Sequence, residues 1–466
     1  MKALASSFRD PSGQVFTDGD AIFRSINESY FADWQHALES GLLAQCVAKG
    51  MMCEFSPAPA PTPCAKAGIK VAKIPFISYP YEWSFAQLKA AALLTLDLHL
   101  AALEKGMILK DASAYNVQFI GASPVFIDLF SFERYREGSA WPAYRQFCMH
   151  FLAPLVLAKY LGSWTGRLSR LWTGGIPLAH AAGQLPWKAR LRPGFALHLF
   201  AHAAMEKRHQ DARGSQAKLK SVKMSRGSLR NLALSLRQLV SSLALEKEKT
   251  QWGEYYTDTN YTPAAFAAKK EIVARVARQA GNKTGLAIDL GANTGEFSGL
   301  LEPYFGYVLS PDVDPAAVQT HHLALAQRGC ESVLPLVMDL SNPSPSLGWA
   351  CVERDSFPAR CAGAGFVMAL ALTHHIVLTE GIPFSQFAAF LHAMLGEGGT
   401  LLLEFAPPND SQVMRMTAAR PDLLDTYCLR ALRAGFADFF EEREEIPVEG
   451  SLRTLFLFTK KETAPA

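Results

Sequence analysis

The chain has 466 residues, of which 49% are hydrophobic and 19% are charged. That balance excludes a disordered protein, and the length is typical of two or three domains. The net charge of +3 comes from 46 basic and 43 acidic residues, so the total charge gives no indication of nucleic-acid or membrane coating.

Eight cysteines are spread along the chain, and none forms a C-x-x-C pair. Zinc ribbons and disulfide scaffolds need clustered cysteines, so both are excluded and no metal site is expected. The N-terminus has no apolar run of signal-peptide length before Arg9, and the apolar run at 151–161 is about half of a membrane span. We therefore expect a cytoplasmic protein with no membrane partner and no indication of nucleic acid.

The first composition zone, residues 1–162, combines short strands with one long helix. Its expected elements, in chain order, are a proline-rich surface loop at 57–63, a strand at 69–77, a helix at 85–103, and two strands of a hairpin at 117–120 and 125–129.

The second zone, residues 163–250, is helical and basic. Between Lys207 and Arg237 it carries nine Lys and Arg against one acid, Asp211. Such a run is either a solvated helical face or a surface for an anionic substrate or partner, and the sequence leaves both open. The zone either completes the first domain or links it to the next one.

The third zone, residues 251–466, alternates helices with short apolar strands. Strands are expected at 285–290, 307–311, 333–338, 365–370 and 400–405. Helices are expected at 264–280, 296–304, 316–328, 384–395 and 423–435. Strands buried on both faces and joined by helices predict a parallel, doubly wound α/β sheet, and the segments 436–442 and 452–459 predict a closing β-hairpin.

A glycine turn follows the first of these strands, in Ala287-Ile-Asp-Leu-Gly-Ala-Asn-Thr-Gly-Glu-Phe297. Gly291 and Gly295 permit a sharp turn and a close approach of the backbone to a ligand. Asn293 and Glu296 stand where the dinucleotide fingerprint requires glycine, so nicotinamide and flavin cofactors are disfavoured.

Acidic residues follow three consecutive strands of this zone. Asp289 ends the first strand, Asp312 follows the second and Asp339 follows the third. Because the carboxyl ends of parallel strands meet at one edge of a sheet, these acids are expected around one ligand. An acid in the position of Asp312 suits the two hydroxyls of a ribose, and one in the position of Asp339 suits an adenine amino group.

With these motifs, residues 252–460 resemble the class I S-adenosylmethionine-dependent methyltransferases, which have a Rossmann-like fold. The resemblance implies that the methionine part of the cofactor lies against Asp289, Gly291, Asn293 and Gly295. It also implies that Asp312 holds the ribose and Asp339 the adenine. Many members of the family have a third glycine where this chain has Asn293, and others have a polar residue there.

The segment after the fourth strand faces the transferred methyl group in this family. Here it contains His374 and His375, and a neutral imidazole can take a proton from a hydroxyl or amine acceptor. Either histidine could instead cap a helix or lie in the core, and methyl transfer can proceed by positioning alone.

Glu404, at the end of the fifth strand, either faces the cleft or lies at the surface edge. The aromatic segments 251–256 and 259–261 are either a lid over the cofactor or a packed linker.

The sequence after the fourth strand also bears on the acceptor. It lacks the Asp/Asn-Pro-Pro-aromatic motif of enzymes that methylate base amines, and it contains no cysteine for a covalent mechanism. The acceptor, a small molecule or a macromolecule, stays unidentified.

The first zone carries a second set of residues. Asp111 lies five residues before Asn116, and Asp128 lies after the next two strands. Kinases space a catalytic base and two magnesium ligands in this way. Residues 70–160 thus resemble the C-lobe of the protein-kinase-like fold, which implies that Asp111 orients a hydroxyl acceptor and that Asn116 and Asp128 hold the metal of Mg-ATP.

The chain departs from the kinase pattern at several places. Leu109 and Lys110 replace His-Arg, Phe130 replaces the glycine of Asp-Phe-Gly, and no glycine-rich loop or Val-Ala-Ile-Lys strand is evident. We therefore expect a degenerate kinase-like α+β domain that binds a substrate or partner.

The sequence thus predicts three parts. Residues 1–162 form the kinase-like domain, 163–250 form the basic helical region, and 251–466 form a methyltransferase that acts on an O or N atom. The alternatives are a bifunctional protein whose first domain phosphorylates a hydroxyl group, and a non-catalytic binding module.

Overall fold

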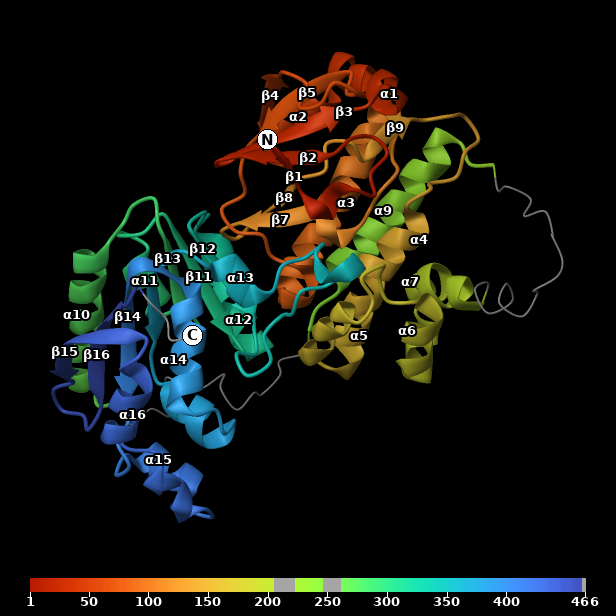
Figure 1. Ribbon diagram of the computed structural model, residues 1–466. Helices are drawn as coiled ribbons and strands as arrows, with labels where there is room; N and C mark the ends of the chain where they lie inside the picture. The colour runs from red at the N-terminus through yellow and green to blue at the C-terminus, as the bar shows by residue number, and fades with distance from the viewer. Residues whose placement is uncertain (205–222, 246–260, 463–466) are drawn as a thin grey trace. The chain divides into compact units, whose positions relative to one another are not determined.

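The computed structural model describes residues 1–204, 223–245 and 261–462 (Figure 1). The chain divides into two compact units, the first with residues 1–248 and 348–354 and the second with residues 249–347 and 355–466. Residues 207–222 of the predicted basic run and residues 251–260 of the predicted lid lie outside the described residues.

The first unit begins with an antiparallel sheet. Its strands lie in the order β1 (Lys2–Ala3), β2 (Val15–Asp18), β3 (Ala21–Ile26), β5 (Ala67–Val71) and β4 (Phe55–Ala58). Two helices connect β3 to β4 along the chain, α1 (Glu28–Glu39) and α2 (Leu42–Ala48). The predicted proline-rich loop begins inside β4, because an edge strand tolerates a proline such as Pro57.

The predicted long helix is confirmed as α3 (Phe85–Glu104). Ser84 begins it with a capping box, in which Ser84 Oγ accepts from the Gln87 amide and Gln87 Oε1 accepts from the Ser84 amide. By length and composition α3 is apolar enough to cross a membrane, and 67% of its apolar window is buried within the protein.

Two pairs of short strands follow α3. β6 (Met107–Leu109) pairs with β9 (Phe132–Arg134), and β7 (Val117–Ile120) forms the predicted hairpin with β8 (Ser123–Phe126). After β9, residues 135–204 and 223–245 contain the helices α4 (Tyr144–Phe147), η4 (Cys148–Leu152), α5 (Ala153–Leu161), η5 (Ser163–Arg170), α6 (Leu178–Gln184), η6 (Trp187–Leu191), α7 (Pro193–Phe195), η7 (Ala196–Phe200) and α9 (Arg226–Ser242). Within the basic run, Arg237 of α9 donates from Nε to Asp97 Oδ1 of α3 at 2.6 Å, so this arginine holds two helices together.

The second unit contains the predicted doubly wound sheet. Its seven strands lie in the order β12 (Val333–Val337), β11 (Tyr307–Asp312), β10 (Leu286–Leu290), β13 (Ala364–Ala369), β14 (Leu395–Phe405), β16 (Thr454–Lys460) and β15 (Phe440–Pro447). The first five are parallel, and β16 and β15 form the antiparallel hairpin that closes the sheet. This α/β fold is Rossmann-like, as the sequence predicts.

Helices cover both faces of this sheet. The strand order reverses between β10 and β13, and right-handed crossovers then place the helices before and after the reversal on opposite faces. The helices are α10 (Pro263–Ala280), α11 (Ser298–Leu301), α12 (Pro315–Gln327), α13 (Phe357–Cys361), α14 (Phe384–Met394), α15 (Ser411–Thr417) and α16 (Leu429–Phe436). The reversal point is where such folds bind ligands.

Two helices differ from the sequence prediction. The helix expected at 296–304 is shortened to α11, because residues 296–297 and 302–304 on either side of it form turns. The helix expected at 423–435 is divided into a short 3₁₀ turn at Pro421–Asp425 and α16. Tyr427 lies between them with its ring fully buried, and its hydroxyl donates to the Ala406 carbonyl at 2.8 Å, which an unbroken helix would not permit.

Gly295 is required by packing between the glycine turn and α12. Its φ is +85°, and a Cβ atom there would lie 2.1 Å from the ring of His321. We expect Gly295→Ala to lower the free energy of unfolding by about 1–3 kcal/mol, from the overlap and the left-handed backbone. Gly299→Ala is the matched control, because nothing lies within 4 Å of the added atom. Urea unfolding of both variants measures the difference, and equal stabilities would refute the packing role.

Candidate functional site

The glycine turn after β10 is tied to the end of the neighbouring strand β11. The amides of Gly291 and Ala292 donate to the Pro311 carbonyl at 3.0 and 3.2 Å, and the Asn293 amide donates to Asp312 Oδ2 at 2.7 Å. Asn293 has a φ of +50°, in the left-handed region that glycine and asparagine adopt most readily. An asparagine in place of the third glycine therefore fits this turn.

Two of the predicted acids are buried beside this turn. Asp289 accepts from Ser298 Oγ at 2.6 Å, and Asp312 accepts from the amides of Asn293 and Asp314. Burial raises the pKa of Asp289 to about 7, and the nearby charge of Asp312 adds to the rise. Burial likewise raises the pKa of Asp312 to about 6. Burial thus outweighs the hydrogen bonds that each carboxylate accepts, and a ligand with an ammonium group and hydroxyls would stabilise the charged forms.

A cavity of about 310 Å³ lies at this edge of the sheet, at the lower end of the range for small-molecule sites. Of the predicted residues it is lined by Asp289, Gly291, Asn293, Asp312, Asp339 and His375, whereas Gly295 and His374 are not among its lining residues. Apolar side chains supply much of the remaining wall, among them Phe266, Phe297, Met338, Leu370, Leu372 and Ile376. Apolar walls with a few polar groups suit an aromatic base joined to a polar chain.

Asp339 stands at a turn beyond β12. Its Oδ1 accepts from Ser341 Oγ at 2.7 Å and from the Ser341 amide at 3.0 Å. The residue is half-exposed and lines the cavity. The neighbours Met338 and Leu340 also line the cavity. The carboxylate is thus held in a fixed orientation next to apolar surface.

The two predicted histidines have different surroundings. His374 is 1% exposed, and its Nδ1 has no hydrogen-bond partner among the described residues. Burial lowers the pKa of His374 to about 3 and that of His375 to about 4, and the charge of Arg453 contributes to both shifts. His375 is therefore neutral at neutral pH and lies at the cavity wall, where it can accept a proton. Just before it, the non-glycine Ala371 adopts a φ of +51°, a strained backbone of the kind found at functional sites.

A buried network of four charges lies next to the cavity. Glu404 pairs with Lys269 and accepts from Arg453 at 2.9 Å, while Arg453 Nε donates to Asp410 at 2.9 Å. Glu404 is 0% exposed and does not line the cavity, so both positions expected for it, cleft and surface edge, are wrong. Burial alone raises the pKa of Glu404, but Lys269 and Arg453 outweigh it and lower the pKa to about 2.

Lys269 is a cavity residue that the sequence analysis missed. It lies on α10 with its Nζ 4.8 Å from the ring centroids of Tyr261 and Phe297, and it lines the cavity with both rings. The Tyr261 hydroxyl donates to Glu404 at 2.7 Å. The signal that distinguishes Lys269 from Lys270 is the apolar spacing of α10, which directs position 269 inward and leaves Lys270 to pair with Glu296 at the surface.

The kinase-like residues of the first unit form a compact cluster. Asp128 Oδ1 accepts from Arg24 of β3 at 2.7 Å, and Asp128 Oδ2 accepts from Ser131 Oγ at 2.5 Å. Asn116 Nδ2 donates to the same Ser131 Oγ at 3.3 Å, and Asp111 accepts from the Ser113 amide at 2.9 Å. Burial raises the pKa of Asp128, but Arg24 and the hydrogen bonds outweigh it, so the pKa is lowered and the carboxylate stays charged.

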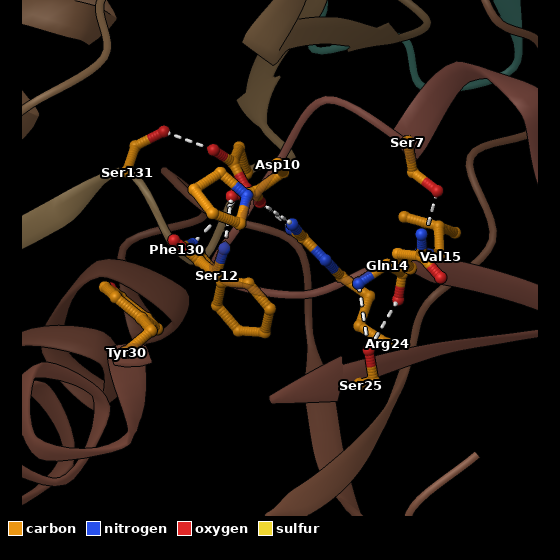
Figure 2. Close-up of polar contacts among 12 residues, drawn as sticks. Ser7, Asp10, Ser12, Gln14, Val15, Arg24, Ser25, Tyr30, Phe130 and Ser131 are labelled. Carbon is orange, nitrogen blue, oxygen red and sulfur yellow. Dashed lines mark hydrogen bonds and ion pairs between the residues drawn. The ribbon is translucent and has the colours of Figure 1, made fainter. Parts of the chain in front are cut away.

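Arg24 is the centre of this cluster. Figure 2 shows its side chain extended toward Asp10, whose Oδ2 lies 3.4 Å from Arg24 Nη2, and the guanidinium also lies 4.0 Å from the ring centroid of Phe130. Both oxygens of Asp128 are thus engaged, and a fixed positive charge stands beside them. Asp128, with both oxygens engaged and a cation beside it, does not fit a magnesium ion. The predicted Mg-ATP site has no support.

Comparisons with known proteins match almost the whole chain to a curated relative and just under half of the chain to solved structures. No protein-family model matches the chain. The nodulation protein NoeA of Rhizobium meliloti (strain 1021) is 35% identical over 476 aligned positions, which span 98% of this chain and 96% of the relative. Among solved structures, the N-methyltransferase NodS of Bradyrhizobium japonicum WM9 is 13% identical, with 43% of this chain and 98% of that chain covered and a TM-score of 0.32. The magnesium protoporphyrin IX methyltransferase ChlM of Synechocystis PCC 6803, with bound S-adenosylmethionine, is 15% identical, with 46% and 87% covered and a TM-score of 0.31.

The buried network should dominate the stability of the second unit. Arg453→Met removes the cation shared by Glu404 and Asp410, so we expect it to lower the free energy of unfolding by about 3–5 kcal/mol. Arg443→Met is the matched control, because its ion pair with Glu441 is exposed and worth at most about 1 kcal/mol. Denaturant unfolding of both variants gives the comparison, and a loss for Arg453→Met no larger than that of the control would contradict the role of the network.

Proposed function

The chain belongs to the family of the nodulation protein NoeA, and from that premise and the cavity geometry we propose that its second unit is an S-adenosylmethionine-dependent methyltransferase. The observation that carries the proposal is the convergence of three acids on one cavity. Asp289, Asp312 and Asp339 come from or directly after three neighbouring parallel strands and line a single cavity beside the glycine turn. By its name, the relative acts in nodulation, and we extend that setting to this chain as part of the proposal.

The residues of the cavity suit the parts of the cofactor. Asp289 suits the ammonium group, and Lys269, the cavity cation on α10, suits the carboxylate. Asp312 at the end of β11 suits the ribose hydroxyls, and Asp339 between Met338 and Leu340 suits the amino edge of the adenine. When bound, S-adenosylmethionine supplies a methyl group to a nucleophile.

The acceptor side of the site contains His375. Its imidazole is neutral at neutral pH and can take the proton that an attacking hydroxyl or amine releases. The buried His374 lies outside the cavity lining, and we assign it a packing role behind His375, at a ring-centroid distance of 4.3 Å. The proposed acceptor atom is an O or N atom of a substrate of unidentified class.

For the first unit we propose a kinase-like fold that does not transfer phosphate. Support comes from the antiparallel sheet with helices between β3 and β4, and from Ala21-Ile-Phe-Arg24 on β3, where kinases carry the Val-Ala-Ile-Lys lysine. The engaged oxygens of Asp128 argue against catalysis and favour a unit that binds a substrate or partner.

The ribose assignment predicts the effect of changing Asp312. Asp312→Asn keeps the size of the side chain but removes its charge, so we expect affinity for S-adenosylmethionine and S-adenosylhomocysteine to fall by at least about tenfold. Glu397→Gln, at an exposed position in β14, is the control. Calorimetric titration of the folded variants measures the effect. Failure of the unchanged protein to bind either compound would refute the methyltransferase proposal, and unchanged affinity in Asp312→Asn would refute the ribose assignment.

The Arg24–Asp128 pair predicts how the first unit responds to nucleotide. With saturating S-adenosylhomocysteine present to occupy the second unit, Mg-ATP should leave the melting temperature of the full chain unchanged. Arg24→Met should destabilise the protein by about 1–3 kcal/mol, since it leaves the partly buried Asp128 without its cation. Lys73→Met, which breaks an exposed pair with Asp20, is the control and should cost at most about 1 kcal/mol. Stabilisation by Mg-ATP that Asp128→Asn abolishes would instead favour the phosphotransfer alternative.

A further inference from the structure

The helical part of the first unit has a one-sided charge. Residues 138–204 contain no Asp or Glu, although the whole chain has 43 of them. The same residues contain seven basic side chains, Arg145, Lys159, Arg167, Arg170, Lys188, Arg190 and Arg192. The formal charge of this stretch of sequence is therefore only positive, and the near-neutral total of the chain conceals it.

Large apolar side chains are exposed in the same part of the unit. Trp164 is 59% exposed, Leu171 70%, Trp187 65%, Leu191 69% and Leu197 55%. Tryptophan and leucine are usually buried, so five such residues within 34 positions of sequence differ from scattered surface residues.

These side chains stand on elements that pack against one another. α5 contacts η5 and α6, α6 contacts η7, and η7 contacts η6 and α7. Figure 1 shows α5, α6 and α7 grouped at one end of the unit. Thr165 in η5, Ala189 in η6 and Leu199 in η7 are fully buried, so each turn is anchored while its tryptophan or leucine faces outward.

The 3₁₀ turn η6 combines both properties in one short segment. In Trp187-Lys-Ala-Arg-Leu191 and the following Arg192, every residue except Ala189 is exposed. The guanidinium groups of Arg190 and Arg192 lie over the rings of Phe200 and Phe195, at 5.3 and 5.9 Å from the ring centroids. The cations are thus held beside the apolar side chains. We call the exposed residues Trp187, Lys188, Arg190, Leu191, Arg192 and Leu197 the basic apolar surface.

We propose that the basic apolar surface binds the surface of a membrane that contains anionic lipids. Lys and Arg attract phosphate headgroups, while Trp and Leu enter the boundary between headgroups and acyl chains. A second copy of this chain seated symmetrically on the same surface would bring like charges together. Nucleic acid would satisfy the charges but would leave Leu191 and Leu197 without apolar contact.

This proposal is independent of the proposed methyltransferase activity, and it differs from the sequence expectation of no membrane partner. That expectation rested on the lack of a signal-peptide run and a spanning segment. Peripheral binding needs neither, because only a few side chains enter the interface.

Vesicle sedimentation of the full chain tests the proposal. We expect the protein to sediment with vesicles that contain phosphatidylglycerol, to stay in solution with phosphatidylcholine vesicles, and to be released by high salt. No sedimentation with phosphatidylglycerol vesicles at low salt would overturn the proposal.

Two sets of variants separate the contribution of the basic side chains to vesicle binding from that of the apolar side chains. Lys188→Gln with Arg190→Gln and Arg192→Gln should lower the vesicle partition coefficient by roughly a hundredfold. Trp187→Ser with Leu191→Ser should lower it by at least about tenfold, whereas Trp349→Ser, at an equally exposed tryptophan outside this surface, should not change it. Thermal melting confirms that each variant is folded.

Other partners give distinct results. Binding of RNA by a protein that does not sediment with vesicles would identify nucleic acid as the partner and overturn the proposal. Concentration-dependent self-association that Trp187→Ser with Leu191→Ser abolishes, without vesicle binding, would identify a second copy and overturn it as well.

Discussion

Four buried charges, Lys269, Glu404, Arg453 and Asp410, govern the architecture of the second unit. They come from α10, the end of β14, the segment before β16 and the start of α15, and they neutralise one another. Each charge alone would be costly to remove from water, so these segments are stable only when all of them are in place. The hairpin that closes the sheet is thereby joined to the helix that precedes β10. The side of Lys269 that faces away from Glu404 lies against Tyr261 and Phe297 and forms part of the cavity wall.

Much of this fold follows from local patterns that the sequence displays directly. The apolar strands, the glycine turn and the acids Asp289, Asp312 and Asp339 are predictable because strand ends of a parallel sheet meet at one edge. The same reasoning could not predict which of His374 and His375 lines the cavity. The direction of each side chain depends on the backbone conformation of the turn after β13. There Ala371 takes a left-handed conformation that no glycine signals.

Long-range charge pairs explain the remaining failures. Glu404 was expected at the cleft or the surface edge, but its cations stand 135 residues before it and 49 residues after it in the sequence. Arg24 and Asp128 are likewise separated by 104 positions. In the first unit, Ala21-Ile-Phe-Arg24 on β3 has an arginine in place of the lysine of a Val-Ala-Ile-Lys strand, so the lysine motif does not identify it. Residues that pair across such long separations in the sequence form no periodic pattern, so a single sequence does not reveal the pair.

Asp289 and Asp312 differ from Asp128 in how their charge is balanced. In the second unit, burial raises the pKa values of Asp289 and Asp312, and the charges of Asp312 and Asp314, respectively, add to the rise. In the first unit, Arg24 stands against Asp128 and lowers its pKa despite burial. A buried acid with a raised pKa gains free energy from a cationic or hydroxylated ligand, whereas an acid with its own arginine must lose an ion pair before a metal can bind. A ligand would therefore stabilise the charged forms of Asp289 and Asp312, whereas Asp128 already has a cation within the first unit.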